Sequence, residues 1–317
     1  MLHIENLNTY SVIIIGAGPS GLATAYYLQQ RGIPFCILEK ASIGFAWQNH
    51  YDSLHLHTMK QVSGLPGLPM PPHYPRFPSG AQVHSYLDLY AQHFEFEIKN
   101  GVEVLHTAYD NSKWKVYTNH GGFECETLIV ATGIWSTPYC ATFDGQEAFG
   151  GLIIHARDYK NATPFLGKRV LVVGAGNSGT EIAVELSEHH IQTGIVIRSG
   201  TTFTPYPTFA PLVRSAAWFF RTFPRALTEP IMNNIRRDFN HLGIAYPNKS
   251  LLDAYPVVGY ELPEAAERGD LQVYGGISHL SKGRVHFEDG QELPFDVIIL
   301  ATGYRPTISF VSDSLEL

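Results

Sequence analysis

The chain has 317 residues, 44% of them hydrophobic and 16% charged, and a formal net charge of −7. This is the composition of a globular protein with apolar material for roughly two domains, and it excludes a fold that depends on disulfides or metal ions. The sequence has no run of Lys and Arg, so we expect no nucleic-acid partner, and we expect no membrane span because no apolar run is long enough.

The cysteines and the first residues bear on the compartment. Cys36, Cys125 and Cys140 are the three cysteines, and they have neither CxxC nor metal-ligand spacing. A sparse, odd-numbered set is typical of a reducing compartment. The first predicted strand starts at Ser11, which leaves no room for a signal or transit peptide. We therefore predict a cytoplasmic protein.

An internal repeat organises the chain. The predicted strand 12–15 leads into Gly16–Gly21 (GAGPSG), and the predicted strand 170–173 leads into Gly174–Gly179 (GAGNSG), an offset of 158 residues (174 − 16). Further along, each unit closes with an apolar strand and the same tripeptide. These tripeptides are Ala131-Thr132-Gly133 and Ala301-Thr302-Gly303.

The surroundings of both glycine motifs fit a dinucleotide-binding turn. Predicted helices at 22–30 and 180–187 follow them directly, which is the strand–turn–helix context that a GxGxxG pattern requires. The first glycine permits the tight turn, the second lets the backbone approach a pyrophosphate, and the third lets helix and strand pack closely. The diphosphate then binds at the helix N-terminus. The sequence predicts an α/β fold with two doubly wound Rossmann-like dinucleotide-binding domains.

Other predicted elements lie between the two motifs. A Pro-rich loop covers 66–78, and a capping box at Ser79 and Gln82 opens a helix at about 80–93. Three short strands follow this helix. They are predicted at Val102–Leu105, Lys113–Thr118 and Phe123–Ala131.

The residue that ends the second strand of each unit predicts which nucleotide binds. In the first unit this is Glu39, 18 residues beyond Gly21 (39 − 21), and an acid there binds ribose hydroxyls and repels a 2′-phosphate, which favours FAD. In the second unit the strand ends at Arg198 and Ser199, 19 residues beyond Gly179 (198 − 179). A guanidinium forks onto phosphate oxygens, which favours NADPH. A solvated surface arginine is the alternative interpretation of Arg198.

The order of these units sets the expected domain bounds. The FAD domain is predicted to be discontinuous, at about 1–155 and 285–317, with the NADPH domain inserted at about 160–284. An aromatic-rich stretch at about 205–250 is interpreted as a helical insertion in the NADPH domain. Trp218 in this stretch could line a substrate tunnel or a dimer contact, but a place in the core is the first interpretation.

Two other chemistries are less well supported. A disulfide reductase with two nucleotide sites needs a redox cysteine pair near the flavin, and the three cysteines form no such pair. The 15 histidines include His55 and His57 two residues apart and the adjacent His189 and His190, but no carboxylate joins them at ligand spacing. We predict no metal site.

The segment between the two units carries a family signature. Phe149–Tyr159 has the pattern FxGxxxHxxxY, with the histidine at His155. The pattern resembles the signature of class B flavin-dependent monooxygenases, in the version of the flavin-containing monooxygenases, whereas Baeyer–Villiger relatives usually have Trp at the position of Tyr159. Tyr51–His57 and Tyr74–Gln82 resemble segments of the plant YUCCA branch, whose members decarboxylate indole-3-pyruvate oxidatively. The resemblance covers nearly the whole chain.

The resemblance implies roles for individual residues. His57 and Asn177 are the candidate catalytic residues, although many relatives have Asn where this chain has His57, and packing is the alternative role of this histidine. Trp47 would pack near the flavin, Val104 at the end of its strand would contact the adenine through its backbone, and His155 would fix the linker between the domains. The cofactor-binding set is Gly16, Gly18, Pro19, Ser20, Gly21, Glu39, Lys40, Trp47, His57, Val104, Ala131, Thr132, Gly133, Gly174, Gly176, Asn177, Ser178, Gly179, Arg198, Ser199, Ala301, Thr302 and Gly303.

The resemblance also implies the reaction. NADPH reduces FAD, molecular oxygen forms a flavin C4a-hydroperoxide, and one oxygen atom passes to a small organic substrate, an amine, a sulfide or an α-keto acid such as indole-3-pyruvate. The alternative enzyme is an NADPH oxidase or flavin reductase that releases peroxide. A non-catalytic flavin-binding redox sensor is the other alternative, because family members usually continue past the point, 14 residues after Gly303 (317 − 303), where this chain stops. Substrate identity and oligomeric state, a homodimer included, stay open at this stage.

Overall fold

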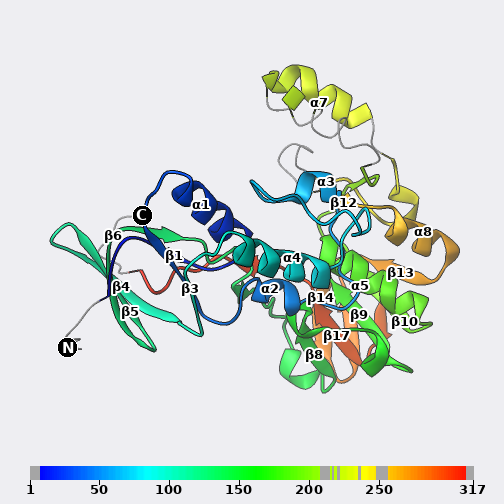
Figure 1. Ribbon diagram of the computed structural model, residues 1–317. Helices are drawn as coiled ribbons and strands as arrows, with labels where there is room; N and C mark the ends of the chain where they lie inside the picture. The colour runs from blue at the N-terminus through cyan, green and yellow to red at the C-terminus, as the bar shows by residue number, and fades with distance from the viewer. Residues whose placement is uncertain are drawn as a thin grey trace. The chain divides into compact units, whose positions relative to one another are not determined.

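Two compact units make up the protein, and each has its own sheet. The computed structural model describes residues 8–207, 215, 218–219, 222–234, 237–247 and 256–311 (Figure 1). Unit 1 comprises Met1–His50, Leu54–Thr137 and Tyr304–Leu317, and unit 2 comprises Tyr51–Ser53 and Pro138–Gly303. Most of unit 2 therefore lies in the sequence between segments of a discontinuous unit 1.

The unit boundaries differ from the bounds expected from the sequence. Residues 138–155 and 285–303 were expected in the FAD domain but group with unit 2. The physical reason is strand pairing, because β8 (Leu152–His155) and β17 (Val297–Leu300) are hydrogen-bonded neighbours in the sheet of unit 2. After the insertion, unit 1 regains only the segment that begins at Tyr304.

Unit 1 is built on a six-stranded sheet with the order β3-β2-β1-β6-β5-β4. The four strands β3, β2, β1 and β6 run parallel and form the nucleotide-binding half, whereas β5 and β4 continue the sheet as an antiparallel meander. The strands are β1 (Asn8–Ile15), β2 (Phe35–Glu39), β3 (Ile98–Asn100), β4 (Val104–Asp110), β5 (Lys113–Thr118) and β6 (Gly121–Val130).

Strand β1 lies between two cores. Val12 and Ile14 point into a core with helices α1 and α4, while Ile13 and Ile15 point into a second core on the other face. Because successive side chains of a strand alternate between faces, a strand buried on both sides has an unbroken apolar sequence. The helices of unit 1 are α1 (Pro19–Gln29), α2 (Phe45–Gln48), α3 (Lys60–Ser63) and α4 (Gly80–His93).

The structure confirms the predicted capping box and corrects one predicted strand. Gln82 N donates to Ser79 Oγ (3.2 Å) and Ser79 N donates to Gln82 Oε1 (2.9 Å), so α4 begins where expected. The strand predicted at 102–105 instead runs from Val104 to Asp110. It is an edge strand with mostly exposed side chains, and therefore no apolar alternation marked its bounds in the sequence.

Unit 2 has a five-stranded, fully parallel sheet with the order β13-β10-β9-β17-β8. Helix α5 lies alongside β9 and β10 on one face, as Figure 1 shows. The antiparallel sheet β14-β15-β16 covers the other face through Leu280, Val285 and Phe287. The remaining strands of unit 2 are β9 (Arg169–Val173), β10 (Gln192–Val196), β11 (Phe203–Thr204), β12 (Val257–Val258), β13 (Leu271–Tyr274), β14 (Ile277–Ser281), β15 (Arg284–Phe287) and β16 (Glu292–Pro294).

Helices of unit 2 complete the list of elements. They are α5 (Asn177–Glu188), α7 (Arg225–Asn234), α8 (Glu261–Arg268) and the 3-10 turns η1 (Gln146–Ala148), η2 (Ala156–Asp158), η3 (Thr163–Phe165) and η4 (Asn240–Leu242). Two short strands, β7 (Thr137–Pro138) and β18 (Tyr304–Arg305), pair with each other. Across the described part of the chain, no helix is both long enough and apolar enough to cross a membrane.

The insertion predicted at 205–250 lies partly outside the described residues. Its described part includes α7, as expected for a helical insertion. The interpretation of Trp218 as core is wrong, because 62% of this residue is exposed. Its indole packs edge-on against Phe223, with ring centroids 5.9 Å apart, and Phe223 is itself 39% exposed. Aromatic composition alone does not tell which side of a helix is buried, and this is why the expectation for Trp218 fails.

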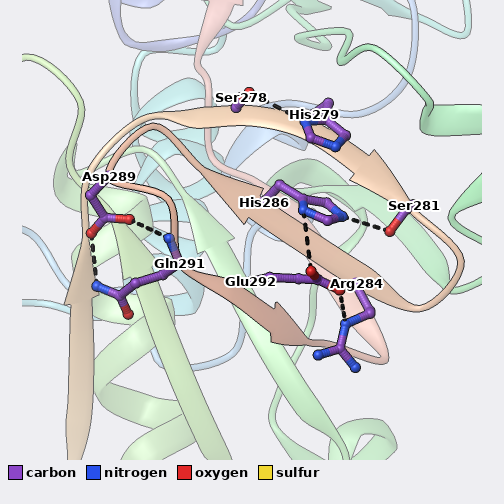
Figure 2. A network of polar contacts seen from close by, with 8 residues as sticks. All are labelled: Ser278, His279, Ser281, Arg284, His286, Asp289, Gln291 and Glu292. Atoms are coloured by element: carbon purple, nitrogen blue, oxygen red, sulfur yellow. Dashed lines mark hydrogen bonds and ion pairs between the residues drawn. The ribbon is translucent and has the colours of Figure 1, made fainter.

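A row of polar side chains crosses the outer face of the antiparallel sheet (Figure 2). His279, His286 and Glu292 are ladder partners on β14, β15 and β16. The two imidazoles stack with centroids 4.0 Å apart, and His286 Nε2 lies 2.7 Å from Ser281 Oγ. Glu292 also forms an ion pair with Arg284. Directly opposed pairs of this kind stabilise one strand register. The row therefore stabilises the register of β14, β15 and β16, the sheet that packs against β17.

Candidate cofactor-binding and active site

Both glycine turns have the backbone that a dinucleotide site requires. Gly16 and Gly174 have φ values of +108° and +110°, and a Cβ at these positions would lie 2.5 and 2.6 Å from the carbonyl oxygen of the alanine that begins each Ala-Thr-Gly tripeptide. A Cβ at Gly21 or Gly179 would lie 2.0 Å from the carbonyl oxygen of the first glycine. The fold itself therefore requires these four glycines.

The middle glycine of each turn has a different environment. A Cβ built at Gly18 or Gly176 meets no atom within 4 Å. Their φ values, −85° and −80°, are open to any residue. The fold does not need glycine at these positions, and the open space beside them fits the close approach of a pyrophosphate to the backbone.

The helices that follow the two turns begin without a side-chain cap. Gly18 and Gly176 are the N-cap residues of α1 and α5, and no side chain bonds to the first N–H groups, whereas Ser79 caps α4. The first N–H groups of a helix have no intrahelical acceptor and bind anions. The residues in these first turns are Pro19, Ser20 and Gly21 in α1 and Asn177, Ser178 and Gly179 in α5. The arrangement fits two bound diphosphates.

Glu39 ends β2 beside the first glycine turn and is only 9% exposed. Its Oε2 accepts a hydrogen bond from Ala17 N (2.8 Å), and its Oε1 accepts one from Ala41 N (3.0 Å). A carboxylate has about four acceptor positions, so ribose hydroxyls can still be bound. The predicted ribose-binding acid thus lies at the turn, and it also fixes the turn to the end of β2. Lys40, the next residue, is exposed.

One hydrogen bond aligns the two turns residue by residue. Gly16 N donates to Leu38 O (2.8 Å), and Gly174 N donates to Val196 O (3.1 Å). The strand registers agree, because Ile15 pairs with Leu38 in unit 1 as Val173 pairs with Val196 in unit 2. Leu38 and Val196 are therefore equivalent positions.

This alignment corrects the comparison made from the predicted strand ends. The equivalent of Glu39 is Ile197, which is 6% exposed, and the equivalent of Lys40 is Arg198. The predicted strand ends set Glu39 against Arg198, one residue out of register with the 158-residue offset of the repeat. Unit 2 therefore has an aliphatic side chain where unit 1 has the acid Glu39, and the exposed residues Arg198 and Ser199 follow it.

The two tripeptides lie against the glycine turns. Ala131 N donates to Ile15 O (2.8 Å), and Ala301 N donates to Val173 O (2.9 Å). Thr132 and Gly133 follow in unit 1, and Thr302 and Gly303 follow in unit 2. Each unit therefore brings together its glycine turn, its second-strand end and its closing tripeptide.

His155 holds the second tripeptide. It is 5% exposed, its Nδ1 accepts from Arg157 N (3.0 Å), and its Nε2 lies 3.1 Å from Gly303 O. Because Nδ1 accepts, the ring proton is on Nε2 and is donated to Gly303 O, which defines the neutral tautomer. Burial lowers the pKa of His155. The histidine therefore holds the end of unit 2 through two contacts to backbone atoms.

The other residues of the signature are packing residues. Phe149 is 1% exposed in the core that contains β17. A Cβ at Gly151 would lie 2.5 Å from the Phe149 ring and 2.7 Å from Asp296 O. Tyr159 is fully buried and stacks on Phe165 with centroids 5.6 Å apart. Phe149, Gly151 and Tyr159 of the FxGxxxHxxxY pattern are therefore packing positions of unit 2.

Trp47 belongs to an aromatic cluster of unit 1. It is edge-on to Trp135, with centroids 6.2 Å apart, and His50 is edge-on to Trp135 at 5.7 Å. The cluster is connected to the glycine turn, because Trp47 N donates to Gly44 O (2.9 Å) and Gly44 N donates to Ala17 O (3.1 Å). Sequence reasoning found Trp47 but missed its partners, although Trp135 follows the first tripeptide closely.

His57 is half-buried on the segment that precedes α3. Three residues on, Lys60 N donates to Arg76 O (2.9 Å), and Lys60 Nζ donates to Pro72 O (2.5 Å) and to Tyr74 O. A lysine bound by two backbone carbonyls joins this segment to the Pro-rich loop. His57 therefore lies on a fixed segment of unit 1.

The structure places the last two predicted site residues at element ends. Asn177 is the first residue of α5, and its Oδ1 accepts from Val258 N (3.2 Å) in β12. This bond orients the amide at the second glycine turn. Val104 begins β4, where it pairs with Thr118, whereas the sequence had placed it at the end of a strand.

One group of polar residues was missed by sequence reasoning. Tyr51, Asp52 and Ser53 belong to unit 2, and the Tyr51 hydroxyl donates to Glu181 Oε2 (2.8 Å) on α5. Ser53 Oγ donates to Glu185 Oε2 (2.7 Å) one helical turn further. The sequence contained one signal, the 181/185 spacing of two acids on the helix that follows the second glycine motif.

Known proteins resemble this chain over most of its length. Residues 13–214 match the family described as pyridine nucleotide-disulphide oxidoreductase. Two Arabidopsis thaliana proteins, named probable indole-3-pyruvate monooxygenases YUCCA9 and YUCCA7, are 34% and 36% identical over 93% of this chain and over 75% and 74% of their own lengths. The structure of a flavin-containing monooxygenase from Stenotrophomonas maltophilia is 25% identical, with a TM-score of 0.77 over 97% of this chain and 82% of that chain.

Two nucleotide turns with uncapped helices, one beside an acid and one beside a cation, define an FAD- and NADPH-using oxidoreductase of the pyridine nucleotide-disulphide oxidoreductase class. Within that class, the chain belongs to the flavin-dependent monooxygenase family that includes the YUCCA enzymes. It is an NADPH-dependent flavoprotein monooxygenase with FAD and NADPH as its cofactors.

The thiols do not support the disulfide chemistry in the name of the wider class. Cys36 and Cys125 are buried, and burial raises the pKa of each to about 11. A reactive thiol needs a depressed pKa and access to its partner. The exposed Cys140 is a single free thiol. The wider class therefore describes the fold of this chain, and the monooxygenase family describes its chemistry.

Proposed function

We propose that unit 1 binds FAD and unit 2 binds NADPH. The support is the difference at the end of the second strand. Glu39 suits the ribose hydroxyls of FAD, whereas Ile197 removes the acid from the equivalent place in unit 2. Arg198 and Ser199 then suit the 2′-phosphate of NADPH, because a guanidinium binds phosphate oxygens in a fork. This difference between two otherwise matching turns is the observation that carries the proposal.

We assign the remaining site residues on the same basis. In unit 1 the Trp47 cluster packs against the flavin, and His57 on its fixed segment is the side chain that donates a hydrogen bond beside the reacting flavin atom. Val104 contacts the adenine through its backbone. In unit 2, Asn177 with its oriented amide binds the coenzyme at the glycine turn, together with the 301–303 tripeptide.

We propose that the substrate is an α-keto acid with an aromatic side chain, and indole-3-pyruvate is the first candidate. The support is the name that relatives of 34–36% identity carry. When bound, FAD supplies the activation of oxygen, which side chains cannot provide. One atom of O2 enters the substrate, which loses CO2 and becomes a carboxylic acid, and the other leaves as water with the two electrons of NADPH. The protein's part is to bind, orient and exclude water.

Product stoichiometry tests this proposal. FAD-loaded protein is mixed with NADPH, oxygen and indole-3-pyruvate, and the NADPH consumed is compared with the carboxylic acid formed and the hydrogen peroxide released. We expect one product molecule per NADPH. A sulfide or an amine oxygenated in place of the keto acid contradicts the substrate assignment. Peroxide equal to NADPH with every substrate indicates an oxidase, and no NADPH consumption indicates a sensor.

The role of His57 is tested separately. In His57→Ala, flavin reduction by NADPH should continue, while the fraction of electrons released as hydrogen peroxide should rise at the expense of product. His55→Ala is the matched control, because His55 is exposed on the same segment. If His57→Ala loses stability but keeps the wild-type ratio of product to peroxide, His57 has only a packing role.

We also propose that the enzyme works in the cytoplasm and that it forms a homodimer. All three cysteines are free, and a reducing compartment keeps thiols in that state. Two-fold symmetric dimers are the commonest oligomers. Fractionation of the native cell and sedimentation of the purified protein test these two statements.

A further inference from the structure

Residues 51–53 form a short segment of unit 2 that covers one face of helix α5. The Tyr51 hydroxyl donates to Glu181 Oε2 (2.8 Å), and Ser53 Oγ donates to Glu185 Oε2 (2.7 Å). Asp52 is also held, since its N donates to Lys160 O (2.8 Å). Each of the three residues of this segment is thus hydrogen-bonded inside unit 2.

The Tyr51 hydroxyl lies at the first turn of α5. Tyr51 is 4% exposed, and burial together with the Glu181 carboxylate raises its pKa far above the usual range, so the phenol keeps its proton. Glu181 is the fifth residue of the helix, so the phenol contacts an acid about one turn behind the diphosphate-binding turn.

The acid on this helix is unfavourable for the coenzyme. Glu181 and Glu185 are four residues apart, and like charges at that spacing repel each other on a helix surface. Side chains on a helix lean toward its N-terminus, so Glu181 leans toward the end that receives an anionic diphosphate. A hydroxyl that donates to the carboxylate fixes its position and stabilises part of its charge.

We propose that Tyr51 is a positioning residue for NADPH, whose hydroxyl fixes the Glu181 carboxylate and stabilises its charge on the helix that begins at the coenzyme-binding turn. The proposal rests on the assignment of NADPH to unit 2. Residue 51 thus contributes to a coenzyme site that is formed mainly by residues more than a hundred positions later in the chain.

Binding of NADP⁺ to the oxidised, FAD-loaded protein tests this role without turnover. In Tyr51→Phe, the Kd for NADP⁺ measured by calorimetry should rise about two- to twelvefold, the value of one hydrogen bond, and the rise should shrink at high salt. Glu181→Gln should bind NADP⁺ as tightly as the wild type or more tightly. Tyr51→Phe/Glu181→Gln should return to the Glu181→Gln value, because the charge that Tyr51 controls is gone.

Matched variants separate this inference from the site assignment. Ser53→Ala removes the bond to Glu185, one turn further from the diphosphate, and should change the Kd less than Tyr51→Phe does. Flavin content should be unchanged in all these proteins. A wild-type Kd in Tyr51→Phe, or a double variant as weak as Tyr51→Phe alone, overturns the inference. If Arg198→Gln also binds NADP⁺ like the wild type, the coenzyme is not in unit 2 and the proposed function fails with it.

Discussion

The glycine turns of units 1 and 2 repeat each other closely, but the residues beside them do not. In each turn, a Cβ built on the third glycine would lie 2.0 Å from the carbonyl oxygen of the first glycine. Both following helices have glycine as the N-cap residue and therefore no side-chain cap. At the end of the second strand, however, Glu39 corresponds to the buried Ile197. The backbone part of a dinucleotide site is therefore common to both units, and one or two side chains decide which nucleotide each unit binds.

The middle glycines offer the largest effect and the most direct test of this comparison. Gly18→Val should give a folded but colourless protein, and Gly176→Val should keep its FAD but lose NADP⁺ binding. Neither glycine has an atom within 4 Å of a built Cβ, so the valine meets the pyrophosphate and not the protein. Flavin absorbance and NADP⁺ titration measure the two losses, and each variant is the control for the other. Full FAD in Gly18→Val would place the flavin elsewhere.

Arg198 tests the part in which the two units differ. The wild type should prefer NADPH over NADH by roughly 10- to 150-fold, since a charge-assisted bond to phosphate contributes about 1.5–3 kcal/mol. Arg198→Gln should lose most of that preference through weaker use of NADPH, and Ser199→Ala should lose less. The measurement is kcat/KM for flavin reduction with each coenzyme. Lys40→Gln, the equivalent change in unit 1, is the control and should keep the preference. An unchanged ratio in Arg198→Gln contradicts the 2′-phosphate site.

His155 contacts the tripeptide that follows β17, the strand of unit 2 that corresponds to β6 in unit 1. An unfolded histidine takes up a proton near pH 6.5, but burial lowers the pKa of His155 in the folded protein. Its contribution to stability is therefore complete above that pH and decreases as the pH falls toward the lower folded value. Thermal midpoints between pH 7.5 and 5.5, scanned at roughly half-unit steps, should fall less steeply in His155→Gln than in the wild type. His120→Gln, at an exposed site of unit 1, should keep the wild-type slope.

Asp296 precedes the first residue of β17, and its replacement has the smallest expected effect, a small loss in the free energy of unfolding. Arg169 Nε and N both donate to Asp296 Oδ2 (3.0 and 2.8 Å), and the Arg169 guanidinium lowers the Asp296 pKa from 3.8 to about 2. This stability is present above pH 3.8 and is lost as the pH falls through about 2. Because the pair is partly exposed, Asp296→Asn should cost about 1 kcal/mol in urea unfolding near neutral pH. The more exposed Arg268–Asp270 pair is the control, and Asp270→Asn should cost less.

The sequence predicted the parts of the fold that depend on local backbone constraints. Gly16, Gly21 and their repeats are required because any side chain would collide with a neighbouring carbonyl, so the pattern survives in the sequence and is easy to recognise. The same holds for the capping box at Ser79 and for the closing tripeptides. From these motifs came the two-domain α/β fold, the two cofactors and the family.

What the sequence could not predict depends on register and on contacts between distant residues. The predicted strand ends set Arg198 against Glu39, whereas the repeat offset of 158 residues (39 + 158) and the paired strands agree that Ile197 is the equivalent residue. Nothing near Tyr51 indicates a bond to Glu181, 130 residues away. The exposure of Trp218 also could not be predicted, because the residue type alone does not tell whether an aromatic side chain on a helix faces the core or the solvent.

The placement of residues 51–53 has a consequence for how such enzymes can be recombined. A chimera that exchanges unit 2 between two relatives at residues 138 and 303 would leave Tyr51–Ser53 behind in the recipient. The transplanted helix would then meet three residues from a different parent at its Glu181 and Glu185 positions. A functional exchange needs four junctions instead of two. The two nucleotide-binding units repeat in sequence like separate modules, but unit 2 can be exchanged intact only together with residues 51–53.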